Sequence, residues 1–109
     1  MVHPFGLVTY REGKDKGTLI AEWINDDPSS LESEIGIGLA TVTKPGSHYY
    51  EGEYRVEYWL AGEVIKLELS IERNGPIYNM SWSRDGETLH TGYGFISGDM
   101  LVAGFERPV

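Results

Sequence analysis

The sequence predicts an all-β protein, an antiparallel meander of about eight strands that closes into a small up-and-down β-barrel. Two observations predict it. Gly accounts for 14 of the 109 residues, and it recurs between short runs rich in β-branched and aromatic residues, a pattern typical of sandwiches and barrels. When hairpin turns are placed at the Gly-containing pairs, the strands on either side keep one continuous apolar face.

Eight runs with strand-like composition follow one another along the chain. A short segment between the second and third, around Asp27-Pro28-Ser29, could start a single helical turn or form a plain loop. The eight expected strands are Phe5–Arg11, Thr18–Asn25, Glu34–Thr43, Tyr49–Leu60, Glu63–Arg73, Pro76–Arg84, Glu87–Ser97 and Asp99–Arg107.

The turn at Ala61-Gly62 gives the first test of register. With Leu60 opposite Glu63, opposite charges pair on one face of the hairpin and apolar side chains pair on the other. The charged pairs are Glu57–Lys66 and Arg55–Glu68, and the apolar pairs are Tyr58–Ile65, Val56–Leu67 and Tyr54–Leu69.

Turns at Asn74-Gly75 and Asp85-Gly86 extend the same apolar face, because such pairs favour the positive φ angles of tight hairpins. The first turn sets Ile71 opposite Tyr78, Leu69 opposite Met80 and Leu67 opposite Trp82. The second sets Trp82 opposite Leu89, Met80 opposite Thr91 and Tyr78 opposite Tyr93. The predicted core face comprises Tyr54, Val56, Tyr58, Leu67, Leu69, Ile71, Met80, Trp82 and Leu89.

Two places in the pattern leave alternatives open. A two-residue loop before the last strand puts Met100, Val102 and Gly104 on the core face, whereas a three-residue loop puts Leu101, Ala103 and Phe105 there. The small residues that alternate with Ile35–Leu39 and with Thr91–Phe95 suit either tight barrel curvature or a bulky group lying against them.

Composition limits the function classes. The length predicts a single domain over residues 1–109, and the formal net charge of −8 with scattered basic residues argues against binding to nucleic acid or to an anionic membrane. The chain has no Cys and starts without a signal-peptide pattern, so we expect a cytoplasmic protein, with a periplasmic location left open. No apolar run is long enough to span a membrane.

The second half of the chain resembles a known fold class. It reads Tyr-x-Gly-x-Tyr-x-Val-x-Tyr from Tyr50, then Gly-Pro-x-Tyr-x-Met-x-Trp, Gly-Tyr-Gly-Phe and Gly-Asp-x-Leu. This hairpin pattern resembles the small up-and-down barrels of the calycin class, the avidins, lipocalins and fatty-acid-binding proteins. The resemblance implies a barrel with a small cavity at most and transfers no specific ligand.

No motif for catalysis, metal binding or a cofactor stands out. His90 is expected on the outer face near Ser81, opposite to the side of Trp82 and Leu89. Asp26, Asp27, Glu32 and Glu34 are close in sequence but lack the spacing of a calcium loop. We expect no metal and no cofactor, and an enzyme ranks last among the hypotheses.

Aromatic side chains with polar tips are the richest functional feature, since they serve as core filler or as ligand walls. The leading hypothesis is a non-enzymatic binding protein for a small apolar or aromatic ligand, and the alternative is a structural or oligomerising barrel with a filled core. Trp59 falls on the charged face, either at a homodimer interface or over Arg55 or Lys66 as a cation–π pair. The candidate ligand-binding residues are Tyr54, Tyr78, Met80, Trp82 and Tyr93.

Overall fold

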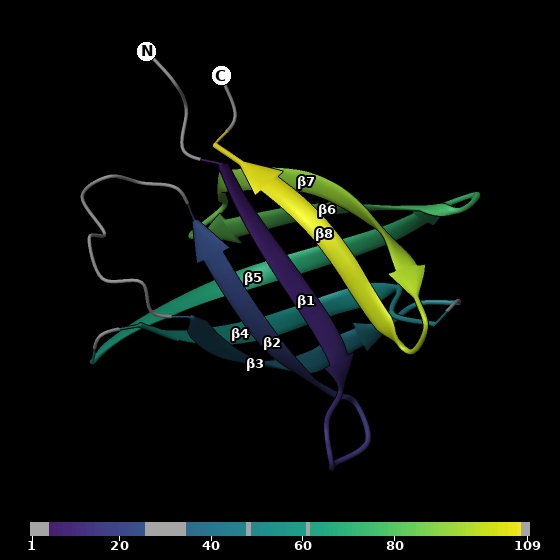
Figure 1. Cartoon of the computed structure of the whole chain (residues 1–109), viewed down its shortest axis with the longest axis horizontal. Helices are drawn as coiled ribbons and strands as arrows, with labels where there is room; N and C mark the ends of the chain where they lie inside the picture. The colour runs from purple at the N-terminus through teal and green to yellow at the C-terminus, as the bar shows by residue number, and fades with distance from the viewer. Residues whose placement is uncertain (1–4, 26–34, 48, 61, 108–109) are drawn as a thin grey trace.

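Eight antiparallel strands form the fold in the computed structural model, which describes residues 5–25, 35–47, 49–60 and 62–107 (Figure 1). The segment around Asp27 and the four acidic residues between 26 and 34 lie outside the described residues. The strands are β1 (Phe5–Glu12), β2 (Thr18–Asn25), β3 (Gly36–Pro45), β4 (Gly52–Leu60), β5 (Glu63–Asn74), β6 (Ile77–Arg84), β7 (Glu87–Ser97) and β8 (Met100–Glu106).

Each strand pairs with the next, and β1 pairs with β8, so the meander closes into a barrel as the sequence predicts. Figure 1 shows β1 and β8 crossing the front of the molecule side by side. Closure matters physically because it leaves no strand edge with unpaired backbone groups. No helix in the described ranges is long and apolar enough to cross a membrane.

The β4–β5 hairpin has the predicted register. Leu60 pairs with Glu63, and the charged and apolar cross-strand pairs all occur as expected. The β5–β6 register differs by two residues, because the turn lies at Gly75-Pro76 and Asn74 pairs with Ile77. An even shift keeps each side chain on its face, so the core face survives while the partners change.

A β-bulge in β7 overturns the predicted facing of that strand. Ser83 pairs with Thr88, whereas Trp82 pairs with His90, so Leu89 is an extra residue. An extra residue reverses the facing of everything beyond it. His90 therefore faces the barrel interior instead of the outside, and Tyr93 faces outwards with 67% of its surface exposed.

The bulge also decides the facing of β8. The β7–β8 loop has two residues, since Ser97 pairs with Met100. The interior residues are nevertheless Leu101, Ala103 and Phe105, the set that the sequence predicts for a three-residue loop. The reason is that the bulge at Leu89 reverses which β7 side chains face inwards before the chain reaches the turn. The two-residue loop then continues this reversed facing into β8.

The core lies inside the barrel, and all of the predicted core residues are buried except Leu89, which is partly buried. The small residues of β3 face inwards and have bulky groups against them, because Trp23 lies against Gly36 and Tyr58 against Gly38. The buried apolar side chains are Val8, Tyr10, Leu19, Ala21, Ala40, Tyr50, Tyr54, Val56, Tyr58, Leu67, Leu69, Ile71, Tyr78, Met80, Trp82, Leu101 and Ala103.

Candidate functional site

Two tyrosines make hydrogen bonds to backbone oxygens at one end of the barrel. Tyr50 is buried at that end, and its hydroxyl donates to the backbone oxygen of Asp99 at 2.7 Å. The hydroxyl of Tyr54 donates in turn to the backbone oxygen of Tyr50 at 3.0 Å. The first bond ties the β3–β4 connection to the β7–β8 turn, and the second holds that connection against β4.

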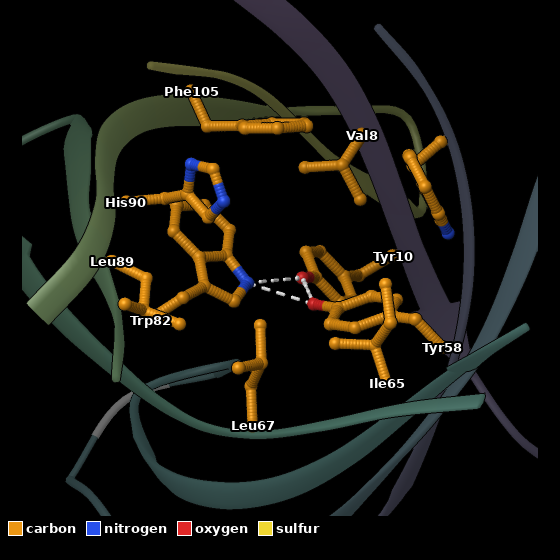
Figure 2. A pocket seen from close by; sticks show the side chains of 10 residues that line it. Val8, Tyr10, Tyr58, Ile65, Leu67, Trp82, Leu89, His90 and Phe105 are labelled. Atoms are coloured by element: carbon orange, nitrogen blue, oxygen red, sulfur yellow. Dashed lines mark hydrogen bonds between the residues drawn. The ribbon is translucent and has the colours of Figure 1, made fainter. Parts of the chain in front are cut away.

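The other end of the barrel holds a hollow of about 110 Å³ among the core side chains (Figure 2). It lies where β1 begins and β8 ends, since Phe5 pairs with Glu106 there. Seven strands contribute to its wall, which is mostly apolar. The lining residues are Val8, Tyr10, Trp23, Tyr58, Ile65, Leu67, Trp82, Leu89, His90 and Phe105.

Three polar groups meet at the wall of this hollow. The indole N–H of Trp82 donates to the Tyr58 hydroxyl at 2.7 Å and lies 3.1 Å from the Tyr10 hydroxyl. The two hydroxyl oxygens are 2.5 Å apart. The dashed lines in Figure 2 join all three groups at the centre of the hollow's lining side chains. We call Tyr10, Tyr58 and Trp82 the donor cluster.

Burial controls the protonation of the donor cluster. Desolvation raises the pKa of Tyr58 to about 12, and it raises the pKa of Tyr10 well above its usual range, where the neighbouring Tyr58 adds to the effect. Both phenols are therefore neutral at physiological pH. Neutral phenols act as hydrogen-bond donors and acceptors, and they are poor general acids or bases at pH 7.

His90 stands at the edge of the hollow against the ring of Phe105, with ring centroids 5.5 Å apart in an edge-to-face arrangement. Burial lowers its pKa, and the positive charge of Arg107 lowers it further. The imidazole is thus neutral at pH 7. Two buried nitrogens on the hollow wall, Nδ1 of His90 and Nε1 of Trp23, have no hydrogen-bond partner in the described part of the chain.

The predicted ligand-binding residues separate in the structure. Trp82 lines the hollow. Tyr54, Tyr78 and Met80 are buried in the barrel but do not line the hollow. Tyr93, on the outer wall of β7, does not share an enclosed space with them, because the bulge at Leu89 turns it away.

Sequence reasoning did not single out Tyr10, Trp23, His90 or Phe105 as site residues. The alternation of Gly6, Val8 and Tyr10 along the first run could have placed Tyr10 on the inner face. His90 could not have been placed, since its facing depends on the bulge.

Outside the barrel, Trp59 is 37% exposed, as its position on the charged face predicts. It pairs with Ile37 on β3 and with Val64 on β5, and both neighbours are exposed. Ile35 and Leu39, two residues before and after Ile37, are exposed as well, and we call the five residues the outer apolar patch.

No group of three or more acidic, His or Cys side chains gathers at metal-binding distance within the described ranges. Comparison with protein-family models, curated proteins and solved structures finds no match to this chain.

Proposed function

We propose that this barrel is a non-enzymatic binding protein for a small apolar or aromatic ligand, held in the hollow beside the donor cluster. The observation that carries the proposal is an apolar hollow with a few converging polar groups, the usual form of a small-molecule site. At about 110 Å³ it is smaller than a drug-sized pocket of roughly 300 Å³ or more. It approaches the roughly 150 Å³ cavity that holds benzene in an engineered protein core.

The proposal is tested by titrating benzene into the labelled protein and following amide and indole resonances by NMR. Shifts should concentrate on residues of the hollow, such as Leu67, Trp82 and Phe105. Val8→Phe should abolish them, because the larger side chain fills the space. Leu7→Phe places the same ring on the exposed outer face of the same strand, outside the hollow, and should leave binding intact.

The alternative function, a structural barrel with a filled core, makes the opposite prediction for the same titration. It is supported by the donor cluster, which already joins three strands without a ligand. If benzene causes no saturable shifts in the wild type, and Val8→Phe raises stability by filling an empty space, the structural hypothesis replaces the binding hypothesis.

A second proposal concerns association. We infer that two copies form a homodimer through the outer apolar patch. The patch extends over three adjacent strands, and charged residues of both signs, Arg55, Glu57 and Lys66, follow it on the same outer face of β4 and β5. A rim with both signs allows a two-fold copy to place opposite charges against each other.

We also propose a family relationship and a cellular location for this protein. The eight-strand meander and the interior hollow support a relationship with the calycin barrels. The absence of Cys from all 109 residues is compatible with a reducing compartment, and we propose the cytoplasm.

A further inference from the structure

The donor cluster carries one more proton than it can use internally. Trp82 offers one N–H, and Tyr10 and Tyr58 offer one O–H each, while the acceptors among the three groups are the two hydroxyl oxygens. The N–H of Trp82 is donated to Tyr58, and one tyrosine donates to the other across 2.5 Å. The second hydroxyl proton therefore has no acceptor within the cluster.

The surroundings of the cluster indicate where that proton can be used. Val8, Ile65 and Leu67 flank it on the wall of the hollow, and their side chains contain no acceptor (Figure 2). A buried donor without a partner costs free energy comparable to a lost hydrogen bond. An occupant of the hollow is the natural source of the missing acceptor.

The other polar side chains on the wall of the hollow also offer more hydrogen-bond donors than acceptors. The buried Nε1 of Trp23 can only donate, and in the described part of the chain it has no partner. Nδ1 of His90 is also unpartnered, and in a neutral imidazole it either donates or accepts. Donors thus outnumber acceptors around the hollow.

The charge of the occupant follows from the environment. The hollow is lined by apolar and aromatic side chains together with His90, and none of its lining residues is Lys or Arg. Burial opposes ionisation of both tyrosines, and the same desolvation would oppose a carboxylate placed beside them. A neutral acceptor avoids this cost.

We propose that the ligand is a small neutral carbonyl compound, a ketone or aldehyde of about five to seven heavy atoms, whose oxygen accepts the free hydroxyl proton of the Tyr10–Tyr58 pair. This inference rests on the proposed binding function and adds the chemical class of the ligand. The apolar body of the molecule would lie against the aliphatic and aromatic wall.

A pair of probes of nearly the same shape tests the carbonyl. Cyclopentanone and methylenecyclopentane differ by the exchange of a C=O for a C=CH₂ group. Their dissociation constants are measured by NMR titration for the wild type and for the triple variant Tyr10→Phe/Tyr58→Phe/Trp82→Phe, because the Trp82 N–H would itself become a free donor if only the two hydroxyls were removed. We expect the affinity ratio in favour of the ketone to fall by roughly two- to tenfold in the triple variant, the range for one hydrogen bond.

The single variants supply a matched control that follows from the proton count. Tyr10→Phe leaves the Trp82–Tyr58 bond and the free proton of Tyr58, and Tyr58→Phe leaves Trp82 to donate to Tyr10. Each single variant should therefore keep most of the ketone preference. A second measurement uses wild-type protein labelled at the tyrosine Cζ atoms, so that it does not depend on folding of the triple variant. The Cζ resonance of Tyr10 or Tyr58 should move with the ketone and stay in place with the alkene.

The outcomes separate this inference from the binding function. If both probes bind in the hollow but their affinity ratio is the same in the wild type and the triple variant, or if both move the Cζ resonances equally, the carbonyl inference fails and the binding function stands. If neither probe binds in the hollow, the binding function itself fails.

Discussion

Trp82 connects the polar and apolar parts of the barrel interior. Its N–H lies within hydrogen-bonding distance of both tyrosine hydroxyls, and its ring packs against Phe105 with centroids 5.5 Å apart. The sequence places Trp82 inside, because it lies on the apolar face of its hairpin. It does not reveal the hydroxyl partners, since Tyr10 and Tyr58 come from strands far away in the chain and meet only when the barrel closes.

Trp82→Ala should lower the free energy of unfolding by about 3–5 kcal/mol, the usual cost of truncating a buried aromatic residue. The loss combines the removed packing with a cavity at the centre of the core. A denaturant titration measures it. Tyr93→Ala removes an exposed aromatic side chain and should cost about 0.5 kcal/mol or less. A loss below about 1 kcal/mol for Trp82→Ala would contradict its place in the core.

His90 should make stability depend on pH. Burial lowers its pKa in the folded state, so below the unfolded value of about 6.5 the unfolded chain binds more protons than the native one. Stability is then fully present above about pH 6.5 and falls as the pH drops towards the folded pKa. Unfolding free energies at pH 7.5 and pH 5.5 should differ more in the wild type than in His90→Gln. Equal differences in the two proteins would show that His90 is not the group responsible.

Among the elements, β7 shows why part of the site could not be predicted. Each of the two possible facings of residues 90–96 has an apolar or small pattern, so alternation along the strand does not choose between them. The interior beside β7 is already occupied by the large rings of Trp82 and Phe105, so the small Gly92 and Gly94 face inwards. By contrast, the β4–β5 hairpin was predictable residue by residue, because opposite charges and apolar pairs agree on one register.

Gly94→Ala should destabilise the barrel by about 1–3 kcal/mol, the range for overpacking a core. A Cβ atom at Gly94 would meet the backbone oxygen of Val102 and the Ala103 side chain, neither of which can rotate away. Thermal or denaturant unfolding measures the effect. Phe95→Ala, one residue further along on the exposed face, is the control and should cost far less. If Gly94→Ala leaves the free energy of unfolding unchanged, β7 and β8 are less closely packed than the structure shows.

On the scale of the whole molecule, the barrel has an apolar interior with a small hollow at one end and an outer wall that carries exposed apolar residues. The eight-strand closure was predictable from turn spacing, because a meander of this length must deal with two edges. The outer apolar patch was predictable only at Trp59. The sequence shows that Ile37 and Val64 alternate with core residues, but their position beside Trp59 depends on the β3–β4 register, which no tight turn specifies.

Trp59→Glu tests the proposed homodimer. Burying a Trp near the centre of an interface stabilises association strongly, provided that its charged neighbours stay at the rim. We expect light scattering to show a dimer for the wild type and a monomer for Trp59→Glu, with unchanged circular dichroism, because the side chain lies outside the barrel. Tyr93→Glu introduces the same charge at an exposed aromatic residue of β7, outside the patch, and should leave the dimer intact. A wild-type protein that is already monomeric at high concentration contradicts the proposal, and Trp59 would then be an exposed side chain of a single barrel.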